Sequence, residues 1–146
     1  MKLQSPGSVL LISCYELGHQ PLSVALPIGF LRRAGFDAAA MDIAVEDFDA
    51  AKVERADFIG ISVPMHTALR LGVRVAQRVR ELNPDCHICF YGIYASLNSE
   101  YLLEHGADSC VGGEYEQPLV SLVESLASGA GGDVEGVIRR GKFALP

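Results

Sequence analysis

The sequence has 146 residues, of which 49 % are hydrophobic, and its formal net charge is −6. This length is enough for one domain with a real core, and the hydrophobic content is too high for a disordered chain. The acidic balance disfavours nucleic acid as a partner, because neutralising phosphates requires clustered Lys and Arg. No hydrophobic run reaches the roughly 18 residues that span a membrane, so we expect no membrane partner and a cytoplasmic protein.

Short hydrophobic runs that end in small or polar residues predict five strands. Their ranges are 9–13, 36–42, 57–63, 87–91 and 108–111. Helices are predicted over 22–34, 45–54, 67–82, 97–105 and 117–127. The clearest of these helices is 67–82, whose hydrophobic residues recur with a period of 3.6. Pro27 is irregular in the first helix, because it lacks an N–H and should kink the helix or delay its start.

The end of the chain is predicted to lie outside this domain. Residues 129–132 indicate a flexible linker, and 134–143 indicate an extended piece with no obvious place in the domain. We therefore expect a domain over 1–128, followed by a linker and connector over 129–146.

The alternation of strands and helices implies a parallel sheet with helices on both faces. The spacing predicts a three-layer, flavodoxin-like (Rossmann-like) α/β fold with five parallel strands in the order 2-1-3-4-5. A sheet of this kind binds its ligand beyond the carboxyl ends of its strands, at the switch point between the first and third strands. The loops after Ser13, Val63, Tyr91 and Val111 should therefore surround one crevice.

The loop after the first strand contains no known phosphate-binding motif. Residues 14–21 match neither GxxxxGK[ST] nor GxGxxG. A response-regulator fold would carry Asp where Ser62 stands, so this class is also excluded. His19 is either a metal ligand or, more commonly for a single loop histidine, a solvated side chain.

The loop after the third strand carries short hydroxyls. Ser62 and Thr67 could bond the polar edge of a ligand or cap the helix that follows. We expect Thr67 to be the N-cap of that helix. His66 lies beside it and either contacts a ligand or is a surface residue.

The last two loops contain glycines. Gly92 lies between Tyr91 and Tyr94, and these tyrosines either line an apolar slot or pack within their own turn. The most specific cluster is 112–116, because its two glycines permit close backbone approach to a ligand. Its acidic residues favour the amino end of the following helix, and helix capping alone does not require both glycines.

The cysteines and arginines have structural explanations. Without a secretion signal, the four cysteines are expected to be reduced. Cys86 and Cys89 form a CxxC inside a strand, where residues three apart point to opposite faces, so joint metal ligation is not expected. The basic row Arg70, Arg74 and Arg78 is typical of a solvated helix face. No nucleophile elbow or other catalytic set is evident, so the residues indicate a binding domain.

Several runs together resemble the cobalamin-binding domain found ahead of radical S-adenosylmethionine enzymes. They are 21–22, 30–36, 56–63 and 111–119, and the resemblance covers roughly 8–128. It implies that the chain holds a corrinoid over the carboxyl edge of the sheet, with the nucleotide tail in the crevice. It also implies a partner, a radical S-adenosylmethionine barrel in cis or in trans. That barrel would hold the iron–sulfur cluster and S-adenosylmethionine and could transfer methyl groups.

The resemblance also implies which residues bind the cofactor. By position, Tyr15, Glu16, Leu17, Gly18 and His19 would face the lower side of the corrin ring. The other implied cofactor-binding residues are Ser62, Val63, His66, Thr67, Tyr91, Gly92, Ile93, Tyr94, Gly112, Gly113, Glu114 and Tyr115. Of these, Ser62, Thr67 and the loop 91–94 would meet the tail, and 112–115 would flank it.

The sequence departs from this family in three places. Related methyltransferases and mutases carry Asp-x-His-x-x-Gly after the first strand, which residues 16–21 do not match, so a cobalt bond from His19 is not expected. Tyr91 stands where relatives often have the first of two glycines, and it could narrow the tail slot. Pro27 departs from the usual first helix.

These departures leave two alternatives to a cobalamin module. One is a cofactor-free scaffold of the same fold that covers a partner barrel. The other is a flavin or nucleotide binder, which the acidic charge and the missing phosphate loop disfavour.

Overall fold

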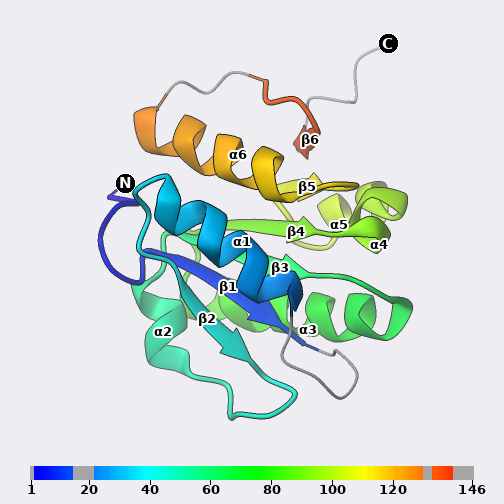
Figure 1. The fold of residues 1–146 in the computed structure, drawn as a ribbon. Coiled ribbons are helices and arrows are strands. Elements are labelled where there is room, and N and C mark those ends of the chain that lie inside the picture. The colour runs from blue at the N-terminus through cyan, green and yellow to red at the C-terminus, as the bar shows by residue number, and fades with distance from the viewer. Residues whose placement is uncertain (1, 15–21, 130–132, 140–146) are drawn as a thin grey trace.

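The computed structural model describes residues 2–14, 22–129 and 133–139, which form one sheet with helices on both faces (Figure 1). The strands are β1 (Val9–Ser13), β2 (Ala39–Asp42), β3 (Phe58–Ser62), β4 (His87–Tyr91), β5 (Ser109–Val111) and β6 (Val137–Arg139). The helices are α1 (Leu22–Arg33), α2 (Ala50–Arg55), α3 (His66–Leu82), α4 (Ile93–Leu97), α5 (Ser99–Glu104) and α6 (Glu116–Ser128). The sheet order among these residues is β2-β1-β3-β4-β5-β6.

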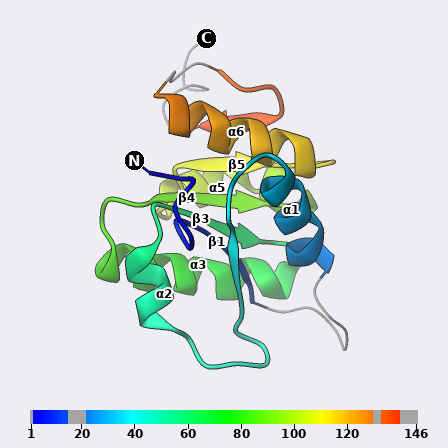
Figure 2. The same cartoon turned by 60° about the vertical axis from the view of Figure 1, so that its left-hand side comes forward.

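Each face of the sheet buries its own hydrophobic cluster. Helices α1 and α6 cover one face, and α2, α3, α4 and α5 cover the other. The turned view in Figure 2 separates these two layers, with α1 and α3 on opposite sides of the strands. The first five strands are parallel, as their burial on both faces requires. The predicted three-layer, flavodoxin-like fold and the order 2-1-3-4-5 are therefore confirmed.

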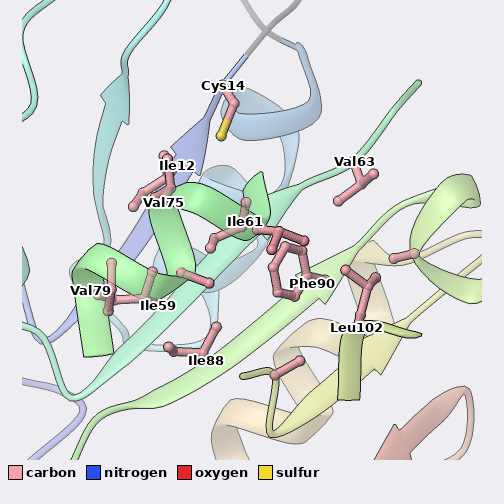
Figure 3. Packing of buried hydrophobic residues seen from close by; sticks show 14 of the residues in the cluster. Ile12, Cys14, Ile59, Ile61, Val63, Val75, Val79, Ile88, Phe90 and Leu102 are labelled. Carbon is pink, nitrogen blue, oxygen red and sulfur yellow. The ribbon is translucent and has the colours of Figure 1, made fainter. Parts of the chain in front are cut away.

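The face under α3 shows how closely the layers pack. Figure 3 shows Ile59, Ile61 and Phe90 of the central strands lying against Val75 and Val79 of α3. A methyl group added at Gly72 of α3 would lie 3.1 Å from Phe90 Cε1. A larger residue at this position would push the helix off the sheet, so this glycine sets the distance between helix and sheet.

The terminal segment is the main correction to the predicted elements. We expected no place in the domain for 134–143, but residues 137–139 form β6, which pairs antiparallel with β5. Val137 and Ile138 pack against the clusters on opposite faces of the sheet. The free edge of β5 and this short alternation of hydrophobic side chains together explain the pairing. That 129–146 connects to a catalytic domain stays a prediction.

Several helix boundaries also differ from those predicted. Helix α3 begins at His66 after an extended Met65, so the expectation that Thr67 is its N-cap is wrong. Helix α2 begins later than expected, where the Asp49 carboxylate accepts hydrogen bonds from the first-turn amides. The predicted helix 97–105 is two helices, since α4 already starts at Ile93 and Asn98 separates it from α5. Pro27 lies inside α1 and does not delay its start.

Candidate functional site

Two buried serines mark the switch point at the carboxyl edge of the sheet. Ser13 ends β1 and Ser62 ends β3, and the two residues are partners in the β1–β3 register. Both are only 2 % exposed. Neither hydroxyl makes a hydrogen bond to a residue in the described ranges, and neither oxygen is among the fully buried side-chain atoms without a partner. The two short hydroxyl side chains therefore lie at the switch point, where they are able to hydrogen-bond a ligand at the carboxyl edge.

Tyr91 continues the same row of the sheet, as the register partner of Ser62. Its side chain is fully buried, and its hydroxyl donates a hydrogen bond of 2.6 Å to the Ser23 carbonyl of α1. Its ring lies 4.9 Å from the Tyr115 ring, at an angle of 51°. A methyl group at Gly60 would lie 3.2 Å from Tyr91 Cε1, so the missing side chain of β3 makes room for the ring. Of the two arrangements considered for this loop, the structure has Tyr91 packed inside the protein.

The loop after β4 closes against β3. A methyl group at Gly92, whose φ is 116°, would lie 2.9 Å from the Val63 carbonyl oxygen, so this position requires glycine. The Gly92 amide donates to the Val111 carbonyl, and the Tyr94 amide donates to the Val63 carbonyl. Ile93 is the exposed residue of this loop, with 58 % of its surface accessible. Ile93, the first residue of α4, is therefore an apolar side chain that is accessible directly after this loop.

The two glycines after β5 have different roles. A side chain at Gly112 would collide with Ser96 of α4, so this glycine permits close packing within the protein. Gly113 is exposed, has a φ of 62° and has open space where a side chain would lie. Glu114 beside it is exposed and lines a hollow of about 630 Å³ together with Gly112 and residues of α6 and 133–136. Of these two glycines, Gly113 is the more exposed and leaves its backbone open to a ligand.

The start of α3 is also open to solvent. His66 and Thr67 are exposed and line a shallow hollow of about 230 Å³ with Arg70, Leu71 and Arg74. Arg70 and Arg74 are exposed, as expected for a solvated helix face. This hollow lies next to the edge but does not include Ser13 or Ser62.

The first loop of the predicted site lies outside the described residues. It comprises Tyr15, Glu16, Leu17, Gly18 and His19. Ranges 2–14, 22–129 and 133–139 hold no cluster of three or more His, Cys, Asp or Glu that could bind a metal ion.

Sequence reasoning missed three residues of this site, Ser13, Ser23 and Gly60. The signal for Ser13 was available, because β1 and β3 are both five-residue buried strands that end in serine. The contacts of Ser23 and Gly60 depend on how α1 packs on the sheet, which no local pattern encodes.

The cysteines are buried in the core. Burial and the nearby Asp42 carboxylate raise the pKa of Cys14 to about 12, so its thiol is protonated at neutral pH. Burial likewise raises the pKa of Cys86 to about 11. Cys86 and Cys89 pack in different clusters on opposite faces of the sheet, which confirms the prediction for the CxxC. In the described part of the chain, no helix has the length and apolar character needed to cross a membrane.

Comparisons with known proteins identify the family of the domain and a solved structure of similar fold. A family model described as "B12 binding domain" matches residues 8–123. The search of curated proteins found no match. Among solved structures, the chain is similar to the radical S-adenosylmethionine methyltransferase TsrM from Kitasatospora setae, determined with tryptophan substrate and the analogue aza-SAM bound. That match has a TM-score of 0.73 and 18 % identity and covers 92 % of this chain. It covers 29 % of the TsrM chain, so the present chain spans less than a third of that protein.

Proposed function

The chain belongs to the family of B12-binding domains, and on this premise we propose that it binds cobalamin and presents it to a radical S-adenosylmethionine catalytic domain. The observation that carries the proposal is the pair of serines, Ser13 and Ser62, that lie side by side at the switch point with hydroxyls not bonded to any described residue. This is the place where an open parallel sheet binds its ligand. The family membership supports cobalamin as the ligand, and methyl transfer remains the finer part of the proposal.

The residues at the carboxyl edge fit the ring of a corrinoid and its polar side groups. Ser13 and Ser62 can donate hydrogen bonds to amide groups at the corrin periphery. The open backbone at Gly113 allows a large ring to approach closely, and exposed Ile93 offers it an apolar contact. His66 and Thr67 border the same edge and would contact the groups that extend over α3.

The radical S-adenosylmethionine partner is proposed from the sequence resemblance and from the similarity in fold to TsrM. When bound, the corrinoid supplies a cobalt ion that can carry a methyl group. The role of this chain is to hold the ring at the sheet edge with its outer face open. The catalytic chemistry would belong to the partner domain.

The test is retention of hydroxocobalamin by the purified 146-residue chain after desalting, followed by its visible spectrum. We expect one corrinoid per chain. Ser62→Ala should weaken binding about fivefold to tenfold, because one hydrogen bond to the ligand is lost. Cyanide added to the retained corrinoid should shift its spectrum, because presentation requires an open face at which cyanide reaches the cobalt.

The matched control is Ser8→Ala, which removes an equally buried hydroxyl at the opposite edge of the sheet. Its binding of hydroxocobalamin should equal that of the wild-type chain. A chain that retains no corrinoid would contradict the proposal and favour the cofactor-free scaffold. A retained corrinoid that cyanide cannot reach would contradict presentation to a partner.

A further inference from the structure

We propose that Tyr91 closes the space between α1 and the sheet to the nucleotide tail, so that the chain recognises a corrinoid by its ring and accepts corrinoids without a tail. This inference rests on the proposed function, because it names the class of corrinoid that the same site takes. It changes the role of Tyr91 from a residue that lines a slot to a residue that fills one.

The first argument is that the ring of Tyr91 occupies the space that a ligand would need. Tyr91 ends β4 next to Ser62 and turns beneath α1, where it is fully buried. On the sheet side, β3 offers only Gly60, and a methyl group there would already lie 2.7 Å from Leu11 Cδ2 and 3.2 Å from Tyr91 Cε1. Interiors packed this closely have no room for a second aromatic group unless the first one leaves.

The second argument is that a specific hydrogen bond holds the ring in place. In an α-helix, the carbonyl of Ser23 accepts from the amide four residues later, which is position 27. That residue is proline and has no N–H to donate. The Tyr91 hydroxyl donates to the Ser23 carbonyl instead, at 2.6 Å. Pro27 and Tyr91, two departures from the family pattern, thus form one arrangement in which the tyrosine hydroxyl provides a donor where proline lacks one.

The third argument concerns the cost of opening the space. Moving the Tyr91 ring would break its bond to the Ser23 carbonyl and its contact with the Tyr115 ring. It would also leave a cavity above Gly60. A nucleotide tail that entered would have to offset all three losses, whereas a ring bound above the edge would leave them intact. The tail is therefore expected to stay outside the protein.

The test compares cobinamide, which lacks the nucleotide tail, with hydroxocobalamin on the 146-residue chain by equilibrium dialysis. We expect the wild-type dissociation constants to agree within about threefold, because the tail makes no contact in the interior. Tyr91→Ala should tighten the binding of cobalamin relative to that of cobinamide by about tenfold or more, because it opens the space between α1 and the sheet.

Two further variants separate the ring from its hydroxyl and from general effects. Tyr91→Phe keeps the ring and should keep the wild-type ratio of the two dissociation constants. Tyr101→Ala removes a tyrosine of α5 that is 46 % exposed, and it should not change that ratio. Circular dichroism checks the fold of each variant, and the wild-type and Tyr91→Phe ratios decide the question even if Tyr91→Ala does not fold.

The outcomes distinguish the inference from the proposed function. A wild-type chain that binds cobalamin about tenfold or more tightly than cobinamide would overturn the inference and leave the proposed function standing. A chain that binds neither corrinoid would overturn the proposed function, and the inference with it.

Discussion

The two edges of the sheet differ in whether their polar side chains are hydrogen-bonded to other described residues. At the amino edge, the Ser8 hydroxyl donates to Asp57 at 2.7 Å, and His87 Nε2 lies 2.8 Å from the Ser109 hydroxyl. At the carboxyl edge, Ser13 and Ser62 are just as buried as Ser8 but have no hydrogen-bond partner within the described ranges.

This difference separates residues that hold the fold from residues that are available to a ligand. The polar groups of the amino edge join strands to one another and to the end of α3, so their loss should reduce stability. The hydroxyls of the carboxyl edge contribute little to stability, and their loss should reduce binding instead. Three predictions test this division, and they follow from the largest expected effect to the smallest.

The largest effect is expected for Arg80, near the end of α3. Its guanidinium donates to the carbonyls of Pro84, Cys86 and Gly106 and to the Asp108 carboxylate, each within 2.9 Å. Arg80→Met should lower the free energy of unfolding by about 3 kcal/mol, because four acceptors lose a charged donor at once. Part of this loss is offset by water, since the Arg80 side chain is 32 % exposed. Urea unfolding at pH 7.5 measures the change.

Arg74→Met is the matched control for this prediction. Arg74 lies on the same helix, is exposed and makes no hydrogen bond or ion pair to the described residues. Its substitution should change the free energy of unfolding by less than about 0.5 kcal/mol. Equal losses for the two variants would show that the amino-edge contacts of Arg80 do not stabilise the fold.

The second effect is a loss of stability in mild acid that depends on His87. Burial lowers the pKa of His87 to about 4, from an ordinary value of 6.5; the Asp108 carboxylate opposes this shift, and the positive charges of Arg139 and Arg80 add to it. Between these two values the unfolded chain binds the proton and the folded chain does not, so stability falls as the pH falls through this window. From pH 7.5 to pH 5 the loss from this residue should be about 2 kcal/mol.

His87→Gln isolates this contribution, because glutamine can bond Ser109 but does not titrate in this range. Between pH 7.5 and pH 5, the free energy of unfolding should fall by about 2 kcal/mol less in the variant than in the wild-type chain. Urea unfolding at both pH values measures this difference. Identical pH dependence in the two chains would mean that His87 is not buried in its neutral form.

The sequence predicted most of the fold because its patterns are local. The alternation of buried strands and helices was enough for the order of the five parallel strands, and the period of 3.6 was enough for α3. It failed for β6, whose three residues are too few to show a period and which is held by the free edge of β5. It failed for α4 because Gly92 and its neighbours are typical of a turn, whereas here contacts with the Val63 carbonyl stabilise a short helix.

For the candidate site, the sequence could predict only the residues that lie at or directly after the ends of strands. Ser62 and Gly113 follow from the rule that ligands bind beyond the carboxyl ends of parallel strands. The contact between Tyr91 and Ser23 joins residues 68 positions apart and depends on how α1 packs, so no pattern in either segment contains it. The sequence marks Pro27 as irregular in α1, but the consequence of its missing N–H, the bond from Tyr91 to the Ser23 carbonyl, depends on tertiary packing.

The smallest effect is expected from a pair of serines that differ only in their edge. Ser8 and Ser62 are each 2 % exposed. Ser8→Ala should lower the free energy of unfolding by about 1.5 kcal/mol, because Asp57 loses a hydrogen bond to its carboxylate. Ser62→Ala removes a hydroxyl that bonds no described residue, and it should change the free energy of unfolding by less than about 0.5 kcal/mol. Urea unfolding without ligand measures both, and an equal loss for the two variants would mean that Ser62 is bonded within the protein in solution. Its assignment to a ligand would then lose its support, because a hydroxyl that already stabilises the fold has no need of a corrinoid to satisfy it.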